Sequence, residues 1–321
     1  MTHIQAVFLF PGQGAQYKGM GADFEEAGGA GKALFGTASA VMGRDMGELL
    51  RNADAETLKR TDLSQPAITL VNLAAFAYLG ERGVMPAGCA GFSLGEYAAL
   101  AAAGVVSFED CFKLVKARGE AMQEAVDRIG TGADAPGMAA VLGLPPEQAA
   151  LLVSRWRDEE GLADLYAANL NSPRQVVVAG TAKALKAAAG RFKEAGARRV
   201  VPLAVAGPFH SPLMEEARER FAPALAEVPF HDPRIPLYSN VTGAEVRTGS
   251  EAKALSLRHI VEPVRWVDEE AAVAGQSGLT VALETGPGTA LQGLWKEINA
   301  PFPCVAAGKT ADIDGITGVR G

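Results

Sequence analysis

The stretch GCAGFSLGEYAAL, residues 88–100, constrains the fold of this chain more than any other segment. A short apolar run ends at Gly91, a single serine, Ser93, lies between Gly91 and Gly95, and an alanine-rich sequence suited to a helix follows. The G-x-S-x-G pattern is typical of a serine held on a sharp strand-to-helix turn, because the glycines let strand and helix approach closely. The alternative is a glycine turn whose serine only caps the helix. The context favours a reactive Ser93 in an α/β protein.

Apolar runs and turn residues divide the chain into two predicted regions. AVFLF (6–10) and GCAG (88–91) are expected to be buried strands, and Pro66 to open a helix that ends near Leu79. Later the pattern becomes strand, helix, two strands, helix and strand, which is typical of a ferredoxin-like unit. We therefore predict a large α/β-hydrolase-like domain with a parallel sheet (1–133 and 205–321) and a small inserted ferredoxin-like (βαββαβ) subdomain (134–204). The cleft between them is the expected binding place.

Charge and composition exclude several partners. The 321 residues carry a formal net charge of -7 without a long basic run, so we expect no nucleic acid partner. The longest apolar passage, from Ile68, is short for a membrane span and contains Asn72, so we expect no membrane association. Three cysteines without C-x-x-C spacing, and an N-terminus without signal-peptide features, predict a cytoplasmic protein.

A reactive serine needs a base and a place for the developing oxyanion. Of the four histidines, His210 in AGPFHSPLM is the best candidate base, because it follows the last predicted strand of the insert, beside the expected cleft. Leu94 would supply one backbone N–H at the start of a helix, where the dipole favours negative charge. Gln13, between two glycines in PGQGAQ, could supply a second N–H, although this loop is equally compatible with a simple strand-to-helix turn.

Arg118 is the most informative charged residue. In the helix predicted from Ser107 to Asp127, it falls beside the apolar stripe and not among the polar positions. A guanidinium placed there needs an anion, because burying an unpaired charge is costly. Two alternatives remain open, an internal salt bridge, for example to Glu96, or a grip on a substrate carboxylate.

Eight segments together carry a resemblance to a known family: FPGQGAQ, GFSLGEYAAL, KARGEAM, AANLNSPRQVVVAG, GPFHSPLM, SNVTG, EPVRW and ETGPG. In this order and spacing the chain closely resembles malonyl-CoA:acyl carrier protein transacylases and the acyltransferase domains of polyketide synthases, over almost its whole length.

The resemblance implies a reaction and a role for each residue. Ser93 would attack the thioester of malonyl-CoA, and His210 would act as base and then as acid. The N–H groups of Gln13 and Leu94 would form the oxyanion hole, and Arg118 would hold the malonyl carboxylate. The thiol of the phosphopantetheine on acyl carrier protein would then accept the malonyl group, without a metal or a cofactor. We expect the enzyme to be a monomer.

Two positions depart from the family pattern. Phe92 stands where the family usually has histidine before the serine, and we expect this to be tolerated because Arg118 carries the charge pairing. His259 stands where many relatives have glutamine, and the change should matter little if the position contributes mainly its backbone carbonyl to orient His210.

Other positions bear on selectivity or support. In polyketide acyltransferases an apolar residue after the serine and a phenylalanine before the histidine accompany malonyl selection, and here these are Leu94 and Phe209. Phe209 would narrow the room for an α-methyl group. Asn169 and Asn240 match recurrent family positions near the cleft, without an assigned role.

Alternatives of different classes are a serine thioesterase or hydrolase and a non-catalytic scaffold. A hydrolase would normally place an acidic third member between Ser93 and His210 in sequence, and no acidic residue there stands out in a motif. Fatty acid synthesis and a trans-acting role on a polyketide synthase would use the same chemistry. We expect the fatty acid role for a free-standing chain of this length.

Overall fold

Strand β1 (Ala6–Phe10) lies in the middle of a six-stranded sheet, and all five of its residues are buried. The strand order is β10-β9-β1-β2-β7-β8. The pairs from β10 to β7 are parallel, and β8 pairs antiparallel with β7. The prediction of a parallel sheet is therefore wrong at this edge, because the three-residue strands β7 and β8 form a tight hairpin. The continuous apolar sequence of β1 fits a strand covered on both faces.

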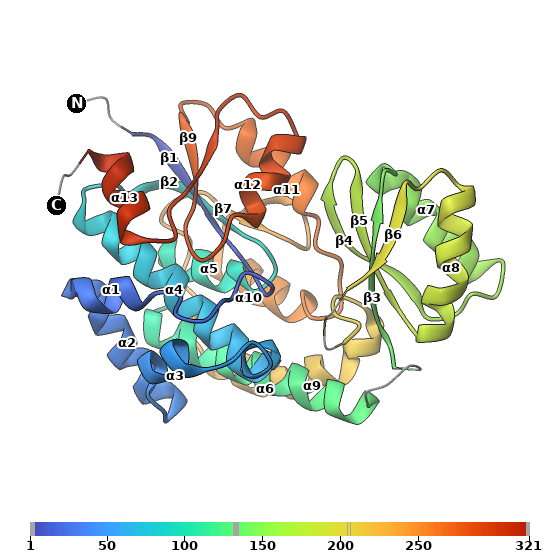
Figure 1. Cartoon of the computed structure of the whole chain (residues 1–321), viewed down its shortest axis with the longest axis horizontal. Coiled ribbons are helices and arrows are strands. Elements are labelled where there is room, and N and C mark those ends of the chain that lie inside the picture. The colour runs from blue at the N-terminus through green and yellow to red at the C-terminus, as the bar shows by residue number, and fades with distance from the viewer. Residues whose placement is uncertain (1–3, 131–134, 204, 206, 319–321) are drawn as a thin grey trace.

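The computed structural model describes residues 4–130, 135–203, 205 and 207–318 (Figure 1). The predicted boundaries at 133/134 and at 204 lie outside these described residues. Outside the second sheet, the elements are β1, α1 (Ala22–Ala27), α2 (Gly29–Met42), α3 (Met46–Asn52), η1 (Thr57–Lys59), α4 (Thr61–Glu81), β2 (Pro86–Gly91), α5 (Gly95–Ala102), α6 (Phe108–Ile129), η2 (Pro212–Met214), α9 (Glu215–Glu227), β7 (Leu237–Ser239), β8 (Ala244–Val246), α10 (Gly249–Arg258), α11 (Trp266–Ala274), β9 (Val281–Glu284), α12 (Ala290–Glu297), β10 (Cys304–Ala306) and α13 (Thr310–Thr317).

Helix α4 is longer than the sequence predicted. It begins at Thr61, and Pro66 lies inside it. The helix starts early because the Thr61 N–H donates to the Gln123 side chain at 2.8 Å, which satisfies a free N–H of the first turn. By length and composition α4 could cross a membrane, but most of it is buried inside the protein. Its apolar sequence is therefore explained by its place in the core.

A second sheet has four antiparallel strands in the order β4-β5-β3-β6. Its elements in chain order are β3 (Gly137–Leu142), α7 (Pro146–Asp158), β4 (Leu165–Ser172), β5 (Gln175–Gly180), α8 (Ala182–Glu194) and β6 (Arg199–Pro202). Helices α7 and α8 pack on one face, where Trp156 and Phe192 meet edge to face at 4.8 Å (Figure 1).

A short seam joins the second sheet to the rest of the protein. The Leu170 N–H donates to the Val264 carbonyl at 2.8 Å, and the Val264 N–H donates to the Ala168 carbonyl at 2.9 Å. These bonds extend β4 toward the segment before α11. They hold Asn169 where the second sheet meets the segment before α11.

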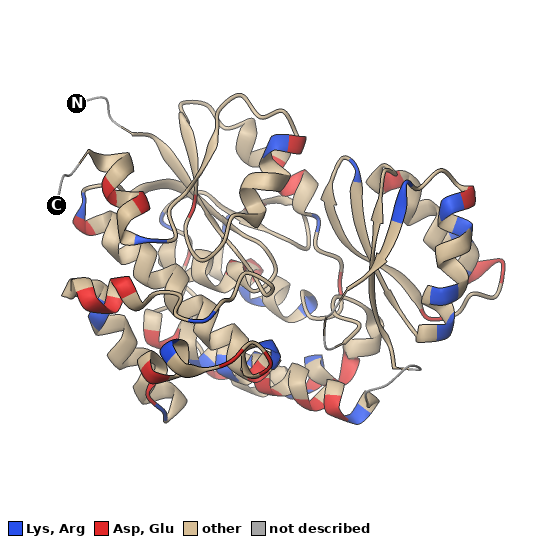
Figure 2. Cartoon of the chain, in the orientation of Figure 1, with Lys and Arg blue, Asp and Glu red and all other residues tan. Residues whose placement is uncertain are grey.

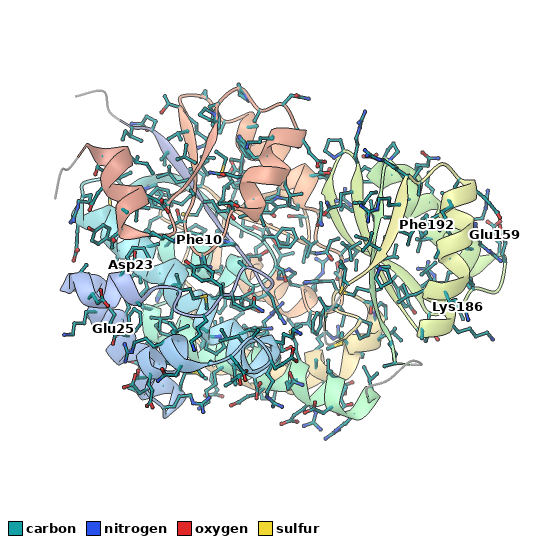
Figure 3. All side chains as sticks on the ribbon, in the orientation of Figure 1. Phe10, Asp23, Glu25, Glu159, Lys186 and Phe192 are labelled. Carbon is teal, nitrogen blue, oxygen red and sulfur yellow. The ribbon has the colours of Figure 1, made fainter. Side chains whose placement is uncertain are left out.

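Charged residues gather on the outer helices and loops, and the strands are mostly free of them (Figure 2). In Figure 3, Phe10 lies in the interior of the larger region, while Glu159 and Lys186 lie at the outer surface of the smaller one. This distribution separates an apolar interior from a solvated exterior, as expected for a globular protein.

Candidate active site

Ser93 lies on the predicted sharp turn between β2 and α5. Its φ is 49°, in the left-handed region, which costs energy for a residue with a side chain. The two flanking glycines are required by contact: a Cβ on Gly91 would lie 2.1 Å from the Gly95 carbonyl carbon, and a Cβ on Gly95 would lie 2.0 Å from the Phe10 carbonyl oxygen. The strand-turn-helix prediction for 88–100 is therefore confirmed, with β2 ending at Gly91 and α5 beginning at Gly95.

His210 meets the serine hydroxyl. Its Nε2 lies 2.8 Å from Ser93 Oγ, and its Nδ1 lies 2.8 Å from the carbonyl oxygen of His259. Because a carbonyl only accepts, Nδ1 carries the proton and donates it, which leaves the Nε2 lone pair for the serine O–H. Burial, and then the nearby charge of Arg118, lower the pKa of His210 to about 3. The imidazole is therefore neutral near pH 7, and its Nε2 lone pair faces the serine hydroxyl.

The backbone around the serine has one N–H already in use. The Ser93 N–H donates to Asn240 Oδ1 at 2.6 Å. An oxyanion donor from this turn must therefore come from the next residue, Leu94, which has helical dihedral angles and precedes α5. The loop that carries Gln13 packs directly on the turn, because a Cβ on Gly12 would lie 2.3 Å from the Phe92 carbonyl oxygen. Gln13 lines the same cavity as Ser93.

Arg118, on α6, is 1% exposed, and its Nε and Nη2 have no hydrogen-bond partner among the described residues. Its guanidinium lies over the Tyr97 ring at 5.4 Å. Glu96 makes no ion pair with it, since its carboxylate accepts the Asn240 N–H at 2.8 Å and the Ser239 hydroxyl at 3.3 Å. Arg118 makes no salt bridge within the described part of the chain, so the salt-bridge alternative is wrong; Glu96 instead binds Ser239, at the end of β7, and Asn240.

Ser93, His210 and Arg118 line one cavity of about 480 Å³. Its wall continues across the second sheet through Met138 and Val177. The predicted residues that line it are Gln13, Phe92, Ser93, Arg118, Asn169, Phe209 and His210. Leu94, Asn240 and His259 are fully buried beside or behind it. The cleft predicted between the two regions is therefore where most of the proposed site residues meet.

Phe92 and His259, the two residues that depart from the family pattern, each pack against another aromatic ring. Phe92 packs edge to face on Trp266, with ring centroids 5.4 Å apart. The His259 ring stacks on His210 at 4.9 Å, and neither of its ring nitrogens has a hydrogen-bond partner among the described residues. Burial first, and then electrostatic interaction with His210 and with the charge of Arg118, lower the pKa of His259. His259 thus offers its carbonyl to His210 and an uncharged ring surface.

Sequence reasoning missed several residues of the site. Asn171 lines the cavity with Asn169, and the alternation of side chains along a strand could have predicted this pair in AANLNSP. Lys59 and Met122 also line it, and no motif marked them. Glu269 is fully buried and accepts a hydrogen bond from Asn240 at 2.7 Å. Burial raises its pKa well above the ordinary value, and the neighbouring Glu96 adds to this.

A half-buried serine, bonded to a buried histidine and sharing a cavity with a buried arginine, defines a site for acyl transfer from a substrate that carries a carboxylate. The family model described as "Acyl transferase domain" matches residues 7–298 of the chain. The malonyl CoA-acyl carrier protein transacylase of Bacillus subtilis is 38% identical over 307 residues, which cover 96% of this chain and 94% of that protein.

Solved structures agree with this match. The acyl carrier protein S-malonyltransferase of Vibrio cholerae has a TM-score of 0.90 at 36% identity, covering 97% of this chain and 99% of that one. A malonyl-transacylase solved in complex with a type II polyketide synthase acyl carrier protein has a TM-score of 0.87 at 33% identity, covering 98% and 100%. The chain therefore belongs to the acyl transferase family. Within that family it is a member of the malonyl CoA-acyl carrier protein transacylases.

Proposed function

We propose that this enzyme transfers the malonyl group from malonyl-CoA to the phosphopantetheine thiol of an acyl carrier protein, through a malonyl ester on Ser93. The observation that carries the proposal is the shared cavity: a hydroxyl 2.8 Å from a neutral imidazole, with an unpaired buried guanidinium in the same wall. The hydroxyl and the imidazole would perform acyl transfer, and the guanidinium would select an acyl group that ends in a carboxylate.

In the first half-reaction the Ser93 oxygen attacks the thioester carbonyl while its proton moves to His210 Nε2. The carbonyl oxygen becomes an oxyanion, held by the N–H groups of Gln13 and Leu94. The intermediate collapses when the C–S bond breaks, and the proton on His210 passes to the departing sulfur. CoA thiol leaves, and malonyl stays on Ser93 as an ester.

In the second half-reaction the thiol of the carrier protein occupies the place that CoA has left. His210 takes the thiol proton, and the sulfur attacks the ester carbonyl. The C–O bond to Ser93 then breaks, and the same proton returns to the serine oxygen. The two halves balance without a metal or a cofactor, since the only groups exchanged are an acyl group and a proton.

Selectivity follows from the other end of the cavity. Arg118 would bind the malonyl carboxylate through two parallel N–H bonds. Phe209, 7% exposed at the cavity wall, would limit the space beside the α-carbon, and Phe92 adds apolar bulk near the serine, whereas Leu94 is fully buried and does not line the cavity. Discrimination against one extra methyl group is worth only about 1 to 3 kcal/mol.

Supporting roles follow from contacts. The His259 carbonyl orients His210 and fixes its tautomer. Asn169, held by the seam at Val264, faces the cavity and is available to the acyl-thioester arm. Asn240 supports the serine turn from behind.

The hydrolase alternative has less support than transfer. His210 is oriented by a backbone carbonyl, where a hydrolase would normally have a carboxylate, and an esterase has no use for a buried, unpaired Arg118. A non-catalytic scaffold would gain nothing from burying the charge of Arg118, which destabilises the fold.

We also propose the cellular setting and the finer fold. We assign the enzyme to fatty acid synthesis in the cytoplasm, as a monomer whose partners are acyl carrier protein and malonyl-CoA, without nucleic acid or membrane; the alternative is a trans-acting acyltransferase of a polyketide synthase. We describe residues 1–133 and 205–321 as a hydrolase-like domain and 134–204 as a ferredoxin-like subdomain. The order β3-α7-β4-β5-α8-β6 supports the second description.

Intact-mass measurement tests the reaction. After mixing with malonyl-CoA, the protein should gain one malonyl group on Ser93, and addition of a phosphopantetheinylated carrier should move that group to the carrier. CoA release without a loaded carrier would support a hydrolase, and absence of any adduct would support a scaffold. Comparing kcat/KM for a fatty acid carrier and a polyketide carrier separates the two pathways.

A further inference from the structure

Asn240, which directly follows β7, bonds to the serine turn through both the oxygen and the nitrogen of its side-chain amide. Its Oδ1 accepts the Ser93 N–H at 2.6 Å. Its Nδ2 donates to the Gly91 carbonyl at 2.7 Å and to Glu269 Oε2 at 2.7 Å. The residue is completely buried, so water cannot replace any of these bonds.

The orientation of the amide follows from its partners. Ser93 offers an N–H and the Gly91 carbonyl offers only lone pairs, so the oxygen must face the first and the NH₂ group the second. An ionised aspartate of the same shape could accept from Ser93, but it would direct lone pairs at the Gly91 carbonyl. Asparagine is therefore the side chain that satisfies both ends of the turn.

Two buried carboxyl groups hold Asn240 in place. Glu96, on α5, accepts its backbone N–H at 2.8 Å, and Glu269, on α11, accepts its side-chain N–H. Through its backbone N–H and its side-chain amide together, Asn240 therefore connects β2, α5 and α11 at one point. A residue held by three elements has little freedom to move, and it restrains Ser93 through their shared hydrogen bond.

We infer that Asn240 is a positioning residue for the nucleophile, which holds Ser93 in its left-handed conformation and directs the hydroxyl toward His210. By taking the Ser93 N–H, it also leaves Leu94 to supply the oxyanion donor of this turn. The inference deepens the proposed function, and its catalytic part depends on it. The alignment of Ser93 with His210 can be tested without malonyl-CoA.

The test compares Asn240→Ala, Asn240→Asp and Ser239→Ala. Ser239 is the matched control, because it is equally buried beside Asn240 and bonds to Glu96, but it does not touch the turn. Two rates are measured in folded protein: labelling of Ser93 by a fluorophosphonate, and single-turnover formation of the malonyl ester. A displacement of about 1 Å can cost about 100-fold, so we expect both rates to fall by about 10- to 100-fold in the Asn240 variants. KM for malonyl-CoA should change by less than about threefold, because Arg118 is untouched.

The outcomes separate the possible explanations. Wild-type labelling rates in a folded Asn240 variant would overturn the inference, as would a raised KM with an unchanged kcat. An equal loss in Ser239→Ala would also overturn it, since general loosening of the core would then explain the effect. If Asn240→Ala does not fold, the two rates of the isosteric Asn240→Asp variant are compared with those of the wild type instead. If wild-type Ser93 reacts with the fluorophosphonate but takes no malonyl group, the proposed function fails while the positioning role is still measured.

Discussion

The two ends of the cavity differ in how completely their polar atoms are partnered. At the serine end, the Ser93 hydroxyl, both nitrogens of His210 and the Ser93 N–H all have partners at 2.6 to 2.8 Å. At the arginine end, Nε and Nη2 of Arg118 have none among the described residues. The serine end is organised before substrate arrives, whereas the arginine end is completed only by an anion. Ser93 and His210 are therefore held in place for the reaction, whereas Arg118 is left free to bind an anionic group of the substrate.

The largest expected effect is at the serine end. Ser93→Ala removes the atom that carries the acyl group, so no malonyl adduct should form, and transfer to the carrier should fall by about 10⁴-fold or more. Intact mass and carrier loading measure the two results. Arg118→Met is the control, and it should still form an acetyl ester from acetyl-CoA. A malonyl adduct on Ser93→Ala would show that another residue is the nucleophile.

The arginine end should control selectivity. Arg118→Met removes the partner of the substrate carboxylate, which is worth about 3 kcal/mol for a buried charge pair, or about 100-fold. The ratio of kcat/KM for malonyl-CoA to that for acetyl-CoA should fall by this factor, in a competition assay with both substrates. An unchanged ratio would show that Arg118 has a structural role and does not select the substrate.

The same substitution should stabilise the fold. A buried guanidinium with two nitrogens that lack a hydrogen-bond partner is costly, and methionine fills a similar volume without charge, so the free energy of unfolding should rise by about 1 to 3 kcal/mol in urea denaturation. Arg82→Met is the matched control, because Arg82 is paired with Asp314 at 2.9 Å and should show no such gain. A less stable Arg118→Met would mean that the folded protein satisfies this charge.

The two ends should also be coupled through pH. Burial first, and Arg118 second, hold the pKa of His210 at about 3, so neutral base persists down to acidic pH in the wild type. Removing the positive charge favours the imidazolium, and the acid limb of kcat/KM should move to higher pH by about one unit in Arg118→Met. Acetyl-CoA is the substrate to use, since it brings no carboxylate of its own. A limb that stays in place would show that the two ends act independently.

The smallest expected effect is at His259. His259→Gln keeps the backbone carbonyl that accepts from His210, so kcat/KM should change by less than about threefold. A loss above about tenfold would show that the stacked ring itself positions the base. Steady-state kinetics on the two proteins measures this difference.

Much of the site could be predicted from local sequence. The turn at Ser93 follows from two glycines between a strand and a helix, and Arg118 was placed beside the apolar stripe by helical periodicity alone. The partner of Arg118 was less accessible, because a single sequence does not say which carboxylate another element has engaged. By sequence Glu96 is a reasonable ion-pair partner for Arg118, but in the folded protein its carboxylate accepts the Asn240 N–H. The early start of α4 was missed because Thr61 depends on Gln123, far away in the chain.

The sequence by itself determined the strand-turn-helix order around Ser93, the element order from β3 to β6 and the residue types available for chemistry, since these depend on contacts between near neighbours. Only the tertiary structure decided that a histidine 117 positions away meets the serine hydroxyl, that a carbonyl and not a carboxylate orients it, and that Asn240 closes the turn from behind. Hydrogen bonds between distant segments depend on packing to within a few tenths of an ångström, and this is fixed only when both sheets and their helices come together.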